Sequence, residues 1–302
     1  MKVTTPPTIL ITGKNGQVGW ELQRALLPLG HLVALDREGI DLADNDSLCR
    51  VVRRVKPDLI VNGAAYTAVD KAEEERDLAM QVNGIAPGVL AEEARRLDSL
   101  LIHYSTDYVF DGSKQTPYSE TDTPEPINTY GAGKLAGERA VQAAGADHLI
   151  LRTSWVYGAR GSNFLLTMLR LMREREELRV VADQTGTPTW ARLIAETTAQ
   201  IIGQSLDERR RKSFQSAIYN LTSAGATTWH GFAEKIKAVA EQGNQRELLT
   251  IQNIEPVSTE EYPTPARRPR NSTMMITKLQ QKYGLTMPNW DAALELCMEE
   301  LS

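Results

Sequence analysis

The sequence of 302 residues predicts an α/β fold, a doubly wound parallel sheet with helices on both faces. Three observations favour this fold. Short apolar runs alternate with amphipathic stretches, a glycine-rich turn follows the first run, and small or polar residues follow later runs. Strands buried in a parallel sheet are near-continuous apolar runs, and the helices that connect them cover both faces. A chain of this length exceeds one typical domain, so a second, smaller α/β unit is also expected.

The N-terminal half shows the alternation most clearly. Apolar residues recur at helical spacing over 46–55 and through a long region from about Asp70 to Leu97, in which a break is expected near Pro87. This half is expected to form the first domain, residues 1–157. Its expected strands are 8–12, 31–36, 58–62, 99–105 and 148–152.

The pattern becomes less regular after Arg152. Helices are expected over NFLLTMLRLMRERE, ARLIAETTAQIIGQ and TTWHGFAEKIKAVAEQ, and strands at RVVADQ and IYNLT. The charged segment 207–213 is expected to be an exposed loop. Residues 158–302 are therefore expected to form mainly a second domain, with some segments returning to the first sheet.

Bulk composition excludes several classes of protein. Charged residues make up 24% of the chain and hydrophobic residues 41%, as in ordinary globular proteins. The net charge of −5 argues against a general binder of nucleic acid or membrane surfaces. The sequence lacks an apolar stretch long enough to span a bilayer, and MKVTTPP lacks the apolar region of a signal peptide, so a cytoplasmic location is expected. The four histidines have no metal-ligand spacing, and no metal site is expected.

The glycine-rich turn indicates a nucleotide site. Gly13, Gly16 and Gly19 lie between the first strand and the first helix, where glycines allow close approach and helix N–H groups suit a pyrophosphate. The spacing is wider than the usual G-x-G-x-x-G, and an ordinary strand-to-helix turn is the alternative. The residues expected to bind a dinucleotide here are Gly13, Lys14, Asn15, Gly16, Gln17, Val18 and Gly19.

Further cofactor contacts are expected after the second and third strands. Asp36 can accept hydrogen bonds from an adenosine ribose, whereas Arg37 can pair with a 2′-phosphate, so the choice between NADH and NADPH stays open. Asp41 and Leu42 are expected to border the adenine, although a solvated loop explains Asp41 nearly as well. Small residues after the third strand leave room for a ligand, with close helix packing as the alternative. The expected contacts there are Ala64, Ala65 and Tyr66.

Tyr130 and Lys134 stand four residues apart in a helical stretch, 24 residues after a Ser-Thr pair that ends the fourth strand at Thr106. This spacing places both side chains on one helix face. A free phenol has a pKa of about 10, and a neighbouring ammonium favours phenolate. We therefore expect Lys134 to lower the pKa of Tyr130 and make it a better proton donor. A solvated surface pair is the alternative.

These residues together resemble the extended short-chain dehydrogenase/reductase superfamily. The resemblance implies a Rossmann-type sheet and a catalytic set of Thr106, Tyr130 and Lys134, in which Lys134 also holds the nicotinamide ribose. A closer resemblance, to the dTDP-4-dehydrorhamnose reductase family, covers nearly the whole chain and is carried by blocks such as STDYVFDG and PARRPRNS. It implies that NADPH or NADH reduces the C4 ketone of dTDP-4-dehydro-β-L-rhamnose to dTDP-β-L-rhamnose, the last step of dTDP-L-rhamnose biosynthesis, while Tyr130 donates a proton.

The family resemblance also implies contacts with the nucleotide-sugar substrate, in the smaller C-terminal domain and beside the catalytic set. Thr106 would bind the sugar, and Asp107 would bind a sugar hydroxyl or tune the local proton affinity, with a solvated carboxylate as the alternative. Trp155 would form an apolar wall against the deoxysugar, with plain core packing as the alternative. Arg267 and Arg268 suit a diphosphate or a structural ion pair equally well. Some family members form dimers through a bridging metal such as Mg²⁺, so a homodimer is possible. Arg192 stands where an acidic ligand would be expected, which argues against the metal.

Two alternative functions stay open. The first is another nucleotide-sugar epimerase or reductase on the same scaffold; a dehydratase is disfavoured because Tyr108, not Glu, follows Asp107. The second is a non-catalytic regulatory subunit that resembles the β subunit of methionine adenosyltransferase and binds a partner enzyme.

Overall fold

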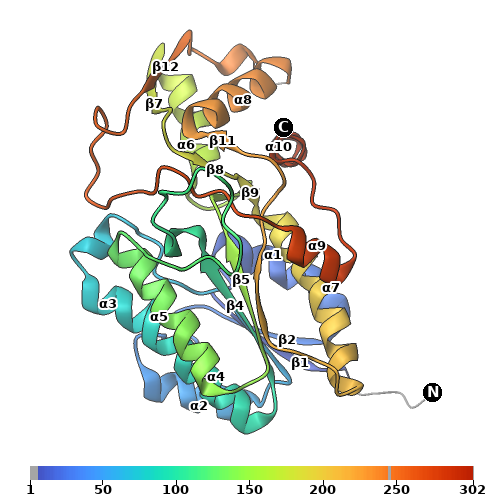
Figure 1. Cartoon of the computed structure of the whole chain (residues 1–302). Helices are drawn as coiled ribbons and strands as arrows, with labels where there is room; N and C mark the ends of the chain where they lie inside the picture. The colour runs from blue at the N-terminus through green and yellow to red at the C-terminus, as the bar shows by residue number, and fades with distance from the viewer. Residues whose placement is uncertain (1–5, 244–245, 302) are drawn as a thin grey trace.

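A six-stranded parallel sheet lies at the centre of the computed structural model, which describes residues 6–243 and 246–301 (Figure 1). The strand order is β10-β5-β4-β3-β1-β2. The chain winds in opposite directions from β1, so a topological switch point lies between β1 and β3, where doubly wound sheets bind ligands. The predicted α/β sheet is confirmed. Its strands are β1 (Thr8–Thr12), β2 (His31–Leu35), β3 (Leu59–Asn62), β4 (Leu100–Thr106), β5 (His148–Thr153) and β10 (Ala217–Asn220).

Helices cover both faces of this sheet because its strands are apolar on both sides. In β1, Ile9 and Ile11 join one buried cluster with side chains of α1 (Gln17–Ala25) and α7 (Ala191–Arg210). Leu10 joins the opposite cluster. Successive strand residues point to opposite faces of the sheet, and helices cover both faces, so Ile9, Leu10 and Ile11 are all buried. The helices that cover the second face are α2 (Asn45–Val55), α4 (Ala86–Leu97) and α5 (Thr129–Ala144).

The long helical region expected over 70–97 is interrupted. It consists of a 3₁₀ turn η2 (Lys71–Glu73), α3 (Arg76–Met80), a π-helical turn η3 (Gln81–Ile85) and α4. Pro87 lies in the first turn of α4, where proline is tolerated because its missing N–H has no helical partner. The irregularity therefore immediately precedes α4.

The prediction of an exposed loop over 207–213 is wrong for its first four residues, because α7 continues to Arg210. Arg209 explains the extension: its guanidinium donates to the carboxylate of Asp147 at 2.8 Å and to that of Asp98 at 2.7 Å. The charged run is a helix end tied to the neighbouring loops by ion pairs.

A second group of elements gathers at one end of the molecule, away from α2 and α4 (Figure 1). Its buried side chains form a separate cluster that includes Phe232 and Leu294. Strand β10 instead belongs to the six-stranded sheet, and α9 (Thr277–Tyr283) packs beside it. The second group contains α6 (Phe164–Glu174), β7 (Glu177–Val181), α8 (Trp229–Gln242), β12 (Asn253–Val257) and α10 (Trp290–Glu299), with the short pairs β6 (Val156–Tyr157) with β9 (Thr189–Trp190) and β8 (Thr185–Gly186) with β11 (Thr227–Thr228).

Three 3₁₀ turns complete the description: η1 (Leu27–Leu29), η4 (Asp107–Val109) and η5 (Arg246–Leu248). Within residues 6–243 and 246–301, no helix is both long and apolar enough to cross a bilayer. The first five residues, which carry most of the expectation about a signal peptide, lie outside the described residues.

Candidate active site

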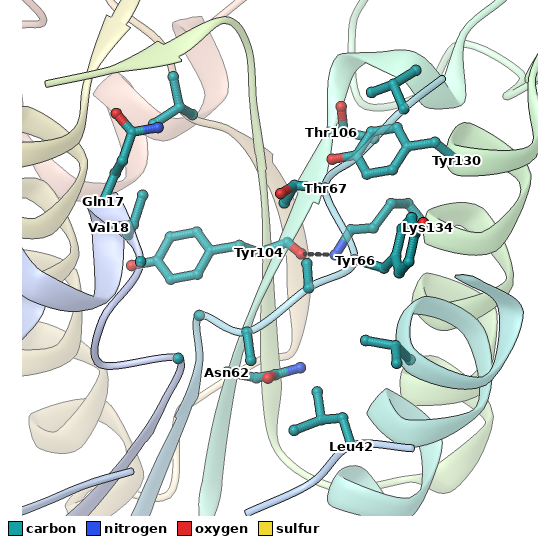
Figure 2. A pocket seen from close by; sticks show the side chains of 18 of the residues that line it. Gln17, Val18, Leu42, Asn62, Tyr66, Thr67, Tyr104, Thr106, Tyr130 and Lys134 are labelled. Atoms are coloured by element: carbon teal, nitrogen blue, oxygen red, sulfur yellow. Dashed lines mark hydrogen bonds between the residues drawn. The ribbon is translucent and has the colours of Figure 1, made fainter. Parts of the chain in front are cut away.

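A cavity of about 1130 Å³ opens at the switch point of the sheet (Figure 2). The glycine-rich turn, the segments that follow β2, β3 and β4, and the start of α5 surround it. Lys14, Gly19, Arg267 and Arg268 do not line it. The expected site residues that do are Gly13, Asn15, Gly16, Gln17, Val18, Asp36, Arg37, Asp41, Leu42, Ala64, Ala65, Tyr66, Thr106, Asp107, Tyr130, Lys134 and Trp155.

The glycine-rich turn leaves space and unpaired donors for a ligand. Gly13 has a φ of 73°, and a Cβ there would lie 2.8 Å from the backbone of Ala64. A Cβ on Gly19 would lie 2.0 Å from the carbonyl oxygen of Gly13, so α1 packs directly on the turn. Gly16 precedes α1 and supplies no side-chain cap. The first-turn N–H groups therefore face the cavity mouth with the positive end of the helix dipole, which suits dinucleotide phosphates.

Charged side chains that follow β2 at the cavity are already paired. The carboxylate of Asp36 lies 3.0 Å from the ammonium of Lys14 and accepts from Asn15 at 3.1 Å. The Lys14 hydrogen bond holds the pKa of Asp36 below its usual value, so this group is a carboxylate at neutral pH. Arg37 lies 3.8 Å from Asp41 at the surface. This part of the cavity therefore offers a carboxylate acceptor, which suits a ribose, beside two cations, which suit a 2′-phosphate.

Asn83 supports the loop after β3 and was not expected from the sequence. It lies in the π-helical turn η3, and its side chain accepts from the N–H of Tyr66 at 2.9 Å and donates to the carbonyl of Tyr66 at 2.9 Å. A Cβ on Gly137 of α5 would lie 2.2 Å from the carbonyl oxygen of Asn83. Asn83 therefore links the cavity-lining loop to the helix that carries Tyr130. Its only sequence signal is a polar residue inside an apolar helical pattern.

Tyr130 lies beside Thr106 inside the cavity, and Lys134 follows one helical turn later (Figure 2). Asn128 caps the N-terminus of α5, because its side chain accepts from the N–H of Gly131 at 2.8 Å. Burial raises the pKa of Tyr130 to about 12; the Thr106 hydroxyl lowers it and the charge of Asp107 raises it. Tyr130 is therefore protonated at neutral pH, which is the state that a proton donor requires.

Lys134 is buried, and its ammonium donates to the carbonyl oxygen of Tyr104 at 2.6 Å. Burial lowers the pKa of Lys134 to about 8, and the carboxylate of Glu138 offsets part of that decrease. The expectation that Lys134 gives Tyr130 a lowered pKa is wrong for this structure, because burial raises the pKa of the phenol and the group that opposes this rise is the Thr106 hydroxyl. Helical spacing correctly predicted that Tyr130 and Lys134 lie on one face of α5, but it carried no information about how deeply the two side chains are buried.

Asp107 orients Thr106. Its carboxylate is 2% exposed; one oxygen accepts from the hydroxyl of Thr106 at 2.8 Å and the other from that of Ser154 at 2.7 Å. Burial raises the pKa of Asp107, and the hydroxyl donors oppose that rise. Both oxygens already have donors, so Asp107 fixes the direction of the Thr106 hydroxyl. Ser154, which completes this network, was not expected from the sequence.

Two tryptophans form an aromatic wall of the cavity. The rings of Trp155 and Trp229 stack with centroids 3.5 Å apart and planes 5° from parallel. Trp155 has a φ of 43°, a conformation that bulky residues rarely adopt. Its indole lies against Gly186, where a Cβ would come within 2.3 Å. Trp229 belongs to a distant part of the sequence, which gave no reason to pair it with Trp155.

Arg268 forms a structural ion pair. Its guanidinium donates to both carboxylate oxygens of Asp70, at 2.9 and 2.7 Å, and also to Thr264. Asp70 additionally accepts from the N–H of Ala266, so the loop is fastened beside η2. Arg267 is exposed. Of the two roles that the sequence left open for Arg268, ion pairing is the one that the structure displays.

Arg192 lies between two carboxylates, Glu21 at 3.3 Å and Glu300. Within the described ranges, no group of three His, Cys, Asp or Glu residues is arranged to hold a metal ion. The guanidinium therefore supplies the positive charge that balances Glu21 and Glu300.

The fold and the site together define an oxidoreductase scaffold of the extended short-chain dehydrogenase/reductase class, with Thr106, Tyr130 and Lys134 at the switch point of a dinucleotide-binding sheet. Residues 7–302 match the family described as RmlD substrate binding domain. The chain belongs to this family, that of the dTDP-4-dehydrorhamnose reductases.

Individual relatives are similar to this chain over nearly its full length. The dTDP-4-dehydrorhamnose reductase of Burkholderia thailandensis is 51% identical over 293 residues, covering 97% of this chain and 98% of the relative. The Escherichia coli K12 enzyme of the same name is 45% identical, with 97% of each chain covered. A crystal structure of the Bacillus anthracis enzyme in complex with NADP is 37% identical, with a TM-score of 0.89, and the match covers 98% of this chain and 100% of that one.

Proposed function

We propose that this protein reduces the C4 ketone of dTDP-4-dehydro-β-L-rhamnose to dTDP-β-L-rhamnose with NADPH or NADH. The observation that carries the proposal is the position of Tyr130 and Thr106, side by side in a cavity that the uncapped helix α1 also borders. The near-full-length similarity to dTDP-4-dehydrorhamnose reductases supports the same substrate.

The residues present fit a dinucleotide. Gly13 and Gly19 leave no room for side chains at the turn, and the first N–H groups of α1 have no side-chain cap. These groups would hold the phosphates, Asp36 or Arg37 would meet the adenosine ribose, and Lys134 would hold the nicotinamide ribose. When bound, the cofactor supplies the hydride for the reduction.

The chain itself manages the proton and the orientation of the ketone. Tyr130, protonated at neutral pH, donates its phenolic proton to the oxygen that becomes the alcohol. The Thr106 hydroxyl, whose proton Asp107 accepts, would position the sugar beside Tyr130 by accepting a hydrogen bond from a sugar hydroxyl. The wall formed by Trp155 and Trp229 packs against the deoxysugar and excludes water. A diphosphate contact by the exposed Arg267 stays a prediction.

We also infer a dinucleotide-binding domain over 1–157 and a mainly substrate-binding domain over 158–302, from which β10 returns to the first sheet. The separate buried cluster in the second group of elements supports this division. A cytoplasmic location and a homodimer are part of the proposal; a reductase that consumes a nucleotide sugar and NAD(P)H needs the pools of the cytoplasm.

The test supplies dTDP-4-dehydro-β-L-rhamnose to the purified chain and compares oxidation of NADH and NADPH. We expect one equivalent of dinucleotide oxidised for each dTDP-β-L-rhamnose formed. Interconversion of sugars without net oxidation of added dinucleotide would instead indicate an epimerase. Binding of a partner synthetase without turnover would indicate a regulatory subunit.

A further inference from the structure

A small hollow of about 250 Å³ adjoins the glycine-rich turn. Its walls are Asn15, Gly16, Gln17, Trp20, Arg160 and Gly161. Four of these residues, three from the turn and Gly161, also line the main cavity, so the two spaces meet at the start of α1. Arg160 is the cationic member of the hollow.

The segment that carries Arg160 is fastened to the glycine-rich turn. The side chain of Asn163 donates to Gln17 at 2.8 Å and to the carbonyl of Arg160 at 3.2 Å, and it also caps α6. Gly161 has a φ of 79°, and a Cβ there would lie 3.2 Å from the side chain of Gln17. This close approach places the backbone around Arg160 over the first turn of α1.

The ring of Trp20 holds the guanidinium of Arg160. Its centroid lies 3.7 Å from the guanidinium carbon of Arg160, and Arg24 stacks on the same ring at 3.8 Å. Arg24 also donates to the carbonyl of Trp20 and lines neither space. The stack leaves the edge donors of Arg160 available to a ligand.

The cations of the main cavity already have partners. Arg37 faces Asp41, Lys71 lies 2.6 Å from Glu75, and Lys134 donates to a backbone carbonyl. Arg160, in contrast, forms no ion pair with any carboxylate in the part of the chain that the structure describes. A pyrophosphate at the start of α1 carries two negative charges, and a guanidinium with open donors suits it.

We propose that Arg160 binds the pyrophosphate of the dinucleotide, closing segment 158–163 over phosphates that the glycine-rich turn holds from the other side. This inference rests on the proposed use of NAD(P)H. It assigns a cofactor contact to the C-terminal side of the predicted domain boundary, so that cofactor binding ties the two parts of the chain together.

The test measures dissociation constants of NADPH and NADH by fluorescence titration for the wild type, Arg160→Gln and Arg24→Gln. Both arginines are exposed and stack on Trp20, so Arg24→Gln is a matched control, and urea unfolding verifies that each variant folds. We expect Arg160→Gln to weaken both dinucleotides about tenfold, with a smaller dependence on salt, and Arg24→Gln to stay within about twofold.

Unchanged affinity in Arg160→Gln, or an equal loss in Arg24→Gln, would overturn the inference while leaving the proposed function intact. A loss for NADPH alone would also overturn it, because it would place Arg160 at the 2′-phosphate. A wild type that binds neither dinucleotide would overturn both proposals.

Discussion

The buried ion pair between Glu138 and Arg152 anchors α5, the helix that carries Tyr130 and Lys134, to the sheet. Glu138 lies on α5 one turn after Lys134, and Arg152 lies on β5. Two hydrogen bonds of 2.8 and 2.6 Å join them, and the side chains are 1% and 2% exposed. Glu138→Gln removes the negative charge and leaves the guanidinium buried without compensation. Breaking one side of such a pair costs about 3–5 kcal/mol of unfolding free energy.

Urea unfolding of Glu138→Gln measures this cost directly. Glu174→Gln on α6 is the matched control, because its ion pair with Arg170, at 2.8 Å, is nearly as short as the 2.6 Å pair of Glu138 with Arg152 but is exposed. Its loss should cost less than about 0.5 kcal/mol of unfolding free energy. The double variant Glu138→Leu/Arg152→Met removes both charges and should recover much of the lost stability. A cost for Glu138→Gln no larger than that of Glu174→Gln would refute the reasoning.

Three further predictions concern the site. Lys134 has a pKa lowered to about 8, so between about pH 8 and 10.5 the unfolded chain holds a proton that the folded chain lacks. As the pH rises through that interval, the unfolding free energy of the wild type should increase by about 3 kcal/mol relative to that of Lys134→Met. A difference in unfolding free energy that stays constant with pH, measured by urea unfolding, would contradict the burial of Lys134. Gly19→Ala places a Cβ 2.0 Å from a backbone oxygen and should abolish tight NADPH binding in titrations. The control Gly203→Ala, whose Cβ would have nothing within 4 Å, should keep the wild-type affinity, and equal NADPH affinity in the two variants would contradict this reasoning. Asp107→Asn replaces one acceptor oxygen by a donor and should reduce turnover about tenfold or more at unchanged NADPH affinity; full turnover would show that Thr106 needs no orientation.

The sequence was sufficient for the sheet because its strands are apolar on both faces and its glycines stand where a turn requires them. Periodicity also placed Tyr130 and Lys134 on one helix face. These are local properties, fixed by neighbours in the chain. The extension of α7 through Arg209 was missed because the ion pairs that stabilise it involve Asp98 and Asp147, far away in the sequence.

Properties that depend on the assembled molecule were not predictable in the same way. The pKa of Tyr130 is raised because the residue is enclosed, and spacing alone does not report enclosure. Asn83 hydrogen-bonds the backbone of Tyr66, and Trp229 stacks on the ring of Trp155. Neither residue forms a recognisable sequence motif with its partner. Arg268 illustrates the reverse case: the sequence identified the residue but left its partner, Asp70, unnamed.

Tyr130→Phe offers the most direct test of the proposed mechanism, because it removes the phenolic proton and little else. Turnover of dTDP-4-dehydro-β-L-rhamnose and the dissociation constant of NADPH should be measured on the same preparation. We expect turnover to fall by about 10²–10⁴-fold while NADPH affinity stays near that of the wild type. Turnover at the wild-type rate would contradict the assignment of Tyr130 as the proton donor.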